Sequence, residues 1–100
     1  SNTMEFSFCS VSLHRVLNEI GSAQRINMRE GVELLLDLPG QEVTVYTDSA
    51  RLSQVINNLV NNAIKFTSEG NIRIGYRPAA SGYVNIFVED NGKRYVKRSA

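Results

Sequence analysis

The residues most able to do chemistry stand close together in QVINNLVNNAIKFT, residues 54–67. They are Asn57, Asn58, Asn61, Asn62 and Lys65. Asparagine costs up to about 0.7 kcal/mol relative to alanine inside a helix, so four in one apolar, helix-like stretch need a reason. An amide oxygen can coordinate Mg²⁺ without adding charge, and Mg²⁺ takes its other ligands from water and substrate phosphates. A lysine beside it can supply a point charge to the same phosphates. These residue types therefore favour a magnesium–phosphate site.

A helix would bring the polar side chains of this stretch onto one side. At about 100° per residue, a polar stripe lies within about 60° of Asn58. Its members are Arg51, Gln54, Asn58, Asn61, Asn62 and Lys65. The opposite side is apolar and predicts a core face of Leu52, Val55, Ile56, Leu59, Val60 and Ala63. A solvated face is the simpler interpretation of the stripe, but such faces are usually filled with Glu, Lys, Gln and Arg, which favour helix.

The flanking sequence predicts where this helix begins and which elements come after it. Asp48 suits an N-cap, and the pattern runs from about Ser49 to Phe66 before TSEG. NIRIGYR and YVNIFVED then alternate apolar and polar residues, which predicts two antiparallel strands joined by a loop at PAASG.

The first half of the chain predicts one helix and two strands. After a short extended piece near residues 6–9, Val11, Val16, Leu17 and Ile20 share one side of a predicted helix that continues toward Ile26. VELLLDLPG is a short apolar run that suits a buried strand. EVTVYTD is a second strand candidate, which either pairs with the first or leads into the asparagine-rich helix.

Composition indicates one small domain with no strong electrostatic bias. The chain has 100 residues and a net charge of +1, which does not favour nucleic acid or an anionic membrane as a partner. Neither a membrane-spanning run nor a signal peptide is visible, and a cytoplasmic location is expected. Cys9 is the only cysteine, which favours a reducing compartment, and we expect it to be a small core residue. His14 is the only histidine, so no metal cluster of histidines and cysteines is possible.

RLSQVINNLVNNAIKFT resembles the N box of bacterial sensor histidine kinases, within the ATPase group that includes gyrase, the heat-shock chaperones and MutL. The resemblance implies that Asn62 binds Mg²⁺, that Asn58 is the first asparagine of the N-x-x-x-N-A motif, and that Lys65 and Phe66 are its lysine and aromatic residue. The other two asparagines lie at positions that the family leaves variable, and we expect them to be solvated.

The identity of residue 58 discriminates within this group. Gyrase-like and chaperone-like members have a glutamate at the position of Asn58, where it activates a water molecule. An amide cannot act as a general base. The resemblance therefore implies a phosphotransfer enzyme that holds ATP without hydrolysing it quickly, and it disfavours a gyrase-like hydrolase.

FVEDNGK has two interpretations. Asn-Gly between strand-like runs is the strongest short signal for a hairpin turn. By its order after the N box, however, it resembles the first glycine box, Asp-x-Gly-x-Gly. Asp90 would then accept a hydrogen bond from the adenine amino group, and Gly92 would let the backbone approach the base. The second glycine of that box falls on Arg94, which does not fit, and the last eight residues, 93–100, resemble a solvated basic tail.

The predicted fold class is α+β, an α/β sandwich: a partial histidine-kinase-type ATPase fold with a mixed, mostly antiparallel sheet and two main helices on one face. Residues 4–92 would form this partial domain, with the N box at 51–67, the start of the first glycine box at 90–92 and a non-family tail at 93–100. Truncation and a shifted reading frame would each explain that ending. The flexible ATP lid and later glycine-rich box have no counterpart here.

The expected function is that of the ATP-binding part of a two-component sensor histidine kinase. Its ligands would be ATP and Mg²⁺, held weakly or not at all by this chain alone. Its partners would be the histidine-bearing dimerisation domain of the same protein, a response regulator and a second copy in a homo-oligomer, but no nucleic acid. SLHRVLNEI lacks the phosphoacceptor pattern, so His14 is expected to be an ordinary helix-surface residue, and no catalytic residue is assigned. The alternative is a degenerate, non-catalytic fragment that acts only in protein contacts.

Overall fold

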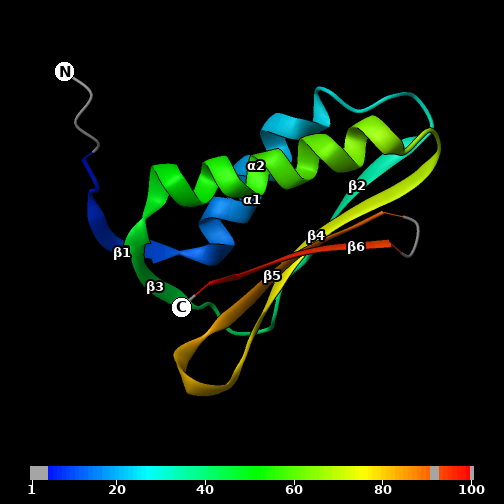
Figure 1. The fold of residues 1–100 in the computed structure, drawn as a ribbon. Coiled ribbons are helices and arrows are strands. Elements are labelled where there is room, and N and C mark those ends of the chain that lie inside the picture. Colours follow the sequence, from blue (N-terminus) through cyan, green and yellow to red (C-terminus); the bar gives the residue numbers. More distant parts are fainter. Residues whose placement is uncertain (1–4, 91–92, 100) are drawn as a thin grey trace.

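The computed structural model describes residues 5–90 completely and the backbone of residues 93–99. Two helices and six strands make up this part of the chain (Figure 1). In chain order the elements are β1 (Phe8–Ser12), α1 (Leu13–Arg25), β2 (Val32–Asp37), β3 (Thr44–Asp48), α2 (Ser49–Phe66), β4 (Gly70–Pro78), the short 3₁₀ turn η1 (Ala80–Gly82), β5 (Val84–Asp90) and β6 (Lys93–Ser99).

The strands form a four-stranded sheet and a separate two-stranded ribbon. In the larger sheet the order is β2-β4-β5-β6, with β2 parallel to β4 and the other neighbours antiparallel. Both helices lie on one face of this sheet (Figure 1). The predicted fold class, with its mixed and mostly antiparallel sheet, is therefore confirmed. The strand EVTVYTD does not pair with VELLLDLPG: it pairs with β1 and leads directly into α2.

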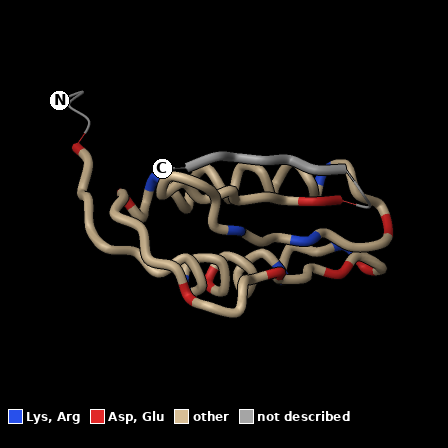
Figure 2. Tube along the Cα trace, turned by 90° about the horizontal axis from the view of Figure 1, so that it is seen from below, with Lys and Arg blue, Asp and Glu red and all other residues tan. Residues whose placement is uncertain are grey.

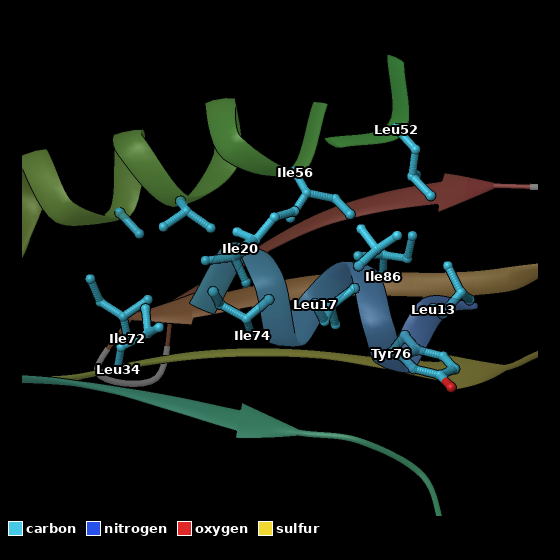
Figure 3. Close-up of a cluster of buried hydrophobic side chains, with 14 of the residues drawn as sticks. Leu13, Leu17, Ile20, Leu34, Leu52, Ile56, Ile72, Ile74, Tyr76 and Ile86 are labelled. Carbon is cyan, nitrogen blue, oxygen red and sulfur yellow. The ribbon is translucent and has the colours of Figure 1, made fainter. Parts of the chain in front are cut away.

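The core lies between the helices and the larger sheet. Figure 3 shows side chains of both helices directed toward those of the sheet. The labelled members are Leu13, Leu17, Ile20, Leu34, Leu52, Ile56, Ile72, Ile74, Tyr76 and Ile86. Four residues of the predicted core face of α2 are buried, whereas Val55 and Leu59 are only half-buried because they lie at its margins.

Two predictions for the first half of the chain are wrong. Val11 belongs to β1, because Ser12 is the N-cap of α1 and accepts a hydrogen bond from the backbone N–H of Arg15. The helix does continue toward Ile26, as predicted: Ile26 is its C-cap and keeps helical backbone angles, with its side chain 85% exposed. Cys9 is exposed instead of buried, because it lies in the two-stranded ribbon, outside the main core.

His14 is also more than a surface residue. It is half-buried, and its Nδ1 is hydrogen-bonded to the hydroxyl of the fully buried Tyr76, whose oxygen also accepts from the backbone N–H of Val43 at 3.2 Å. Burial raises the pKa of the Tyr76 phenol above its ordinary value, so it stays protonated and able to donate. His14 therefore has a structural role in joining α1 to the sheet.

Residues 93–99 form a strand and not a tail. β6 pairs with β5 along its whole length, from Asp90 opposite Lys93 to Val84 opposite Ser99. This is the hairpin interpretation of FVEDNGK, and it holds because the backbone N–H and C=O groups of β5 need partners on that side. Residues 91–92, including the predicted site residue Gly92, lie outside the described residues.

Candidate functional site

Helix α2 is held at its beginning by Asp48. The Oδ1 of Asp48 accepts a hydrogen bond from the backbone N–H of Arg51 at 3.1 Å, and its Oδ2 accepts from the backbone N–H of Ser7 at 2.8 Å. The predicted N-cap is therefore confirmed, and it also ties the segment before β1 to the helix. These two backbone hydrogen bonds, that of Ser7 first, lower the pKa of Asp48 below its ordinary value.

The lowered pKa of Asp48 predicts a pH dependence of stability. A depressed carboxylate pKa stabilises the fold fully above the ordinary pKa of about 3.9, and this contribution is lost as the pH falls through the folded-state pKa. We expect Asp48→Asn to have a lower thermal midpoint than wild type at neutral pH, with the difference shrinking below about pH 4. Thermal unfolding followed by circular dichroism from neutral to acidic pH measures this. A difference that grows on acidification would contradict the assignment, and Glu5→Gln, an exposed carboxyl, is the control.

The polar stripe of α2 faces solvent near the end of the helix. Asn58, Asn62 and Lys65 are all exposed, and within the described chain neither asparagine side chain has a hydrogen-bond partner. The Nζ of Lys65 lies 5.7 Å from the centre of the ring of Phe66, which is itself 68% exposed. The C-terminal part of the stripe, together with Phe66, therefore offers amide oxygens, one cation and an aromatic surface to a ligand.

The other two asparagines also contact α1: Asn61 is exposed, as expected, whereas Asn57 is half-buried, so the expectation that it is solvated is wrong. The side-chain amide of Gln24 in α1 donates to Oδ1 of Asn57 at 2.8 Å and to Oδ1 of Asn61 at 3.1 Å. The helical period of α2 does not reveal Gln24, because this residue lies on the other helix. A signal for it exists in α1, since Gln24 follows Leu17 and Ile20 at the spacing of buried helix positions.

Asp90 ends β5 and is the second part of the predicted site. It is 4% exposed, and its Oδ1 has no hydrogen-bond partner among the described residues. A buried acceptor without a partner costs about 1–3 kcal/mol. The donor to this oxygen therefore comes from a group that the structure does not describe, and a bound ligand is one such group.

The C-terminal part of the stripe and Asp90 lie at the same end of the sheet. α2 ends at Phe66, β4 begins shortly afterwards at Gly70, and Ile72 of β4 is paired with Asp90. In Figure 1 the C-terminal end of α2 and the end of β5 lie at this same end of the sheet. Asn58 lies farther back along α2, about 10 Å from Lys65 at 1.5 Å per residue.

The charged side chains of α2 favour an anionic ligand, whereas those of the molecule as a whole do not. Basic and acidic positions are interspersed along the described trace (Figure 2). On β4, Arg77 is paired with Asp37 of β2 at 2.6 Å. α2, by contrast, carries Arg51 and Lys65 and no acidic residue. No helix among the described residues has the length and apolarity required to cross a membrane.

The arrangement fits a nucleotide with its magnesium ion. Amide oxygens and a lysine match the oxygen-coordinated metal and the phosphates. The partnerless oxygen of Asp90 can accept a hydrogen bond from an exocyclic amino group of a base. The base of a nucleotide is buried more readily than its phosphates. The described residues therefore offer groups of the chemical kinds that a metal–phosphate group and an amino-bearing base can contact.

Comparison with known proteins identifies the same stretch. A sequence model of the family described as histidine kinase-, DNA gyrase B-, and HSP90-like ATPase matches residues 47–98. The aerobic respiration control sensor protein ArcB of Escherichia coli (strain K12) is 39% identical over 70 residues, which cover 70% of this chain and 9% of ArcB. The adaptive-response sensory kinase SasA of Synechococcus elongatus is 37% identical over 81 residues, 80% of this chain and 20% of SasA.

Solved structures share the fold. Full-length ShkA in complex with AMPPNP has a TM-score of 0.82 and 26% identity, over 92% of this chain and 20% of that one. The histidine kinase ThkA in complex with the response regulator protein TrrA has a TM-score of 0.71 and 26% identity, over 81% of this chain and 25% of that one. This chain therefore spans at most a quarter of these relatives. The chain belongs to the histidine kinase-, DNA gyrase B-, and HSP90-like ATPase family, and within it resembles the ATP-binding domains of sensor histidine kinases.

Proposed function

We propose that this chain binds Mg-ATP as the nucleotide-binding part of a two-component sensor histidine kinase. The observation that carries the proposal is the buried, partnerless oxygen of Asp90 at the same end of the sheet as the unpartnered amides of α2. The family and the printed descriptions of the relatives support it: ShkA was solved with AMPPNP, and ArcB and SasA are named as a sensor protein and a sensory kinase.

Each described residue has one role in this proposal. The amide oxygen of Asn62 would coordinate Mg²⁺, which neutralises phosphate charge when bound. Asn58 and Lys65 would contact the polar end of the ligand, and the exposed ring of Phe66 would border it. Asp90 would accept a hydrogen bond from the adenine amino group. Residues 4–92, including Gly92, would form the nucleotide-binding portion.

The reaction of the whole protein would be phosphotransfer and not rapid hydrolysis. Asn58 has no basic lone pair with which to activate water, so ATP held here would be protected from hydrolysis. The γ-phosphoryl group would pass to a histidine on a dimerisation domain of the same protein and then to a response regulator. The description of ThkA in complex with TrrA supports a partner of that class. We propose a cytoplasmic location for this part of the protein.

A non-catalytic role in protein contacts is the second candidate. Two features favour it. Strand β6 begins shortly after Asp90 and pairs with β5. Within this strand, Arg94 stands where the family motif has a glycine. The two candidates differ in whether Mg-ATP binds at all, which a direct titration decides.

Calorimetric titration with Mg-ATP tests the proposal. We expect a dissociation constant in the millimolar range, because the exposed stripe leaves bound phosphates open to water on one side. EDTA, which removes Mg²⁺, should weaken binding further. Heat signals that are identical with buffer and with 10 mM Mg-ATP, about ten times the expected dissociation constant, would favour the second candidate. Low-micromolar affinity would contradict the expected weakness.

The association state depends on the edges of the sheet. β6 caps β5 but is itself an edge strand, as is β2 on the other side, and an exposed edge can pair with another chain. We expect a dimer or larger assembly at micromolar concentration. Light scattering after size exclusion measures the mass directly, and a monodisperse species near 11.2 kDa would show that the β5–β6 hairpin is sufficient to keep the chain monomeric.

A further inference from the structure

Gln24 lies between the two helices and joins them through its side-chain amide. It is 6% exposed, and its Nε2 donates to both Asn57 and Asn61, while its Oε1 accepts from Nδ2 of Asn27 at 3.2 Å. Both N–H donors of Gln24 and its acceptor are therefore used, which gives the amide one defined orientation. We refer to Gln24, Asn27, Asn57 and Asn61 as the amide clasp.

The clasp holds α2 next to the residues that face the proposed ligand. Asn57 directly precedes Asn58, and Asn61 directly precedes Asn62. Neighbouring residues of a helix are about 100° apart, so Asn61 lies at the margin of the polar stripe and Asn57 lies just beyond it. Because Asn57 and Asn61 are one turn apart, α2 is held at two points along its axis. Both its rotation and its axial position relative to α1 are thereby fixed.

Apolar packing alone would fix these positions less strictly. The buried side chains of α2 contribute a non-directional attraction, whereas a hydrogen bond weakens steeply when its geometry changes. Burying an amide also carries a desolvation cost that an apolar residue at position 24 would avoid. Asn57 is half-buried and Asn61 is exposed, so water could satisfy both without Gln24. The clasp therefore contributes to a defined helix orientation more than to burial.

We propose that Gln24 is a positioning residue of the nucleotide site, which acts through the amide clasp to orient Asn58 and Asn62. This inference rests on the proposed binding of Mg-ATP by the stripe. Gln24 itself lies on α1, outside the stretch that carries the ligand-facing asparagines, and touches no ligand in this arrangement.

The test compares Gln24→Met with a matched control. Methionine keeps the length and the burial of the side chain but removes both donors. Gln41→Met makes the same change at an exposed position between β2 and β3. For each chain the thermal midpoint is measured, together with the ¹⁵N-resolved NMR signals of Asn58 and Asn62, first in the free protein and then during titration with Mg-ATP.

Gln24→Met is expected to move the Asn58 and Asn62 signals of the free protein and to weaken Mg-ATP binding about tenfold, as loss of an outer-shell partner does at metal sites. Gln41→Met should do neither. The double variant Gln24→Met/Asn57→Leu should bind no more weakly than Gln24→Met, because both changes break the same contact.

A lowered thermal midpoint with unchanged Asn58 and Asn62 signals and unchanged affinity would overturn the inference and leave Gln24 a purely structural residue. Equal Mg-ATP titrations in wild type and Gln24→Met would also overturn it while leaving the proposed function intact. If the wild-type signals do not respond to Mg-ATP, the proposed function fails and this inference fails with it.

Discussion

Replacing Asn62 with alanine is expected to abolish the dependence of ATP affinity on magnesium. Asn62 is exposed on the stripe, and within the described chain its side chain has no hydrogen-bond partner, so its amide oxygen is free for a metal ion. Because Mg²⁺ takes only one or two protein oxygens at such sites, loss of one should weaken Mg-ATP binding about tenfold or more. The affinity for ATP in EDTA should stay the same.

Titration of wild type and Asn62→Ala with ATP, in Mg²⁺ and in EDTA, measures this effect. The matched control is Asn18→Ala, an exposed asparagine of α1 whose amide donates to the backbone oxygen of His14. It should preserve the full magnesium effect. If Asn62→Ala binds Mg-ATP as wild type does, the metal assignment is wrong. Because Asn62 is exposed, its replacement should change stability by little, so a folding defect would not explain lost binding.

Selectivity for the base is expected to depend on Asp90. Its partnerless Oδ1 can accept from the amino group of adenine, whereas guanine presents an oxygen at that position, so that two acceptors would face each other. We expect a preference for ATP over GTP of at least tenfold, about 1.4 kcal/mol. Asp90→Asn has nearly the same shape but can turn its amide donor toward guanine, and should lose this preference.

Parallel titrations with ATP and GTP test the adenine assignment in wild type and Asp90→Asn. Asp37→Asn is the control, since it makes the same chemical change at a carboxylate whose ion pairs with Arg77 and Arg73 are partly exposed and contribute little. It should keep the preference for ATP. Equal affinities for the two nucleotides in wild type would contradict the adenine assignment.

Helix α2 can be predicted from the sequence, with the bounds that the structure has. Its signals are local: an N-cap at Asp48, an apolar period that ends near Ala63, and a break after Phe66. The signals for the strands around PAASG are equally local, because a hairpin pairs residues that are close in sequence. The same helical period predicts most of the polar stripe.

The features that the sequence does not predict depend on contacts between distant segments. Pairing of β1 with β3 and of β2 with β4 requires the whole topology, and the single-strand patterns do not specify it. The charge of residues 93–99 predicts a basic tail, and their sequence lacks the apolar–polar alternation of a strand, although β5 offers them a free edge. The link from Gln24 to Asn57 and Asn61 joins two helices, and the period of either helix alone cannot reveal it.

The most direct test of the proposed function is to map Mg-ATP onto the chain by NMR. Assigned ¹⁵N signals are followed during a titration to 10 mM, about ten times the expected dissociation constant. The proposal predicts that the largest shifts cluster at Asn58, Asn62, Lys65, Phe66 and Asp90, with smaller ones at the ribbon of β1 and β3, which lies around the opposite end of α2. Shifts that are absent, or that centre on that ribbon, would contradict binding of the nucleotide by the asparagine stripe.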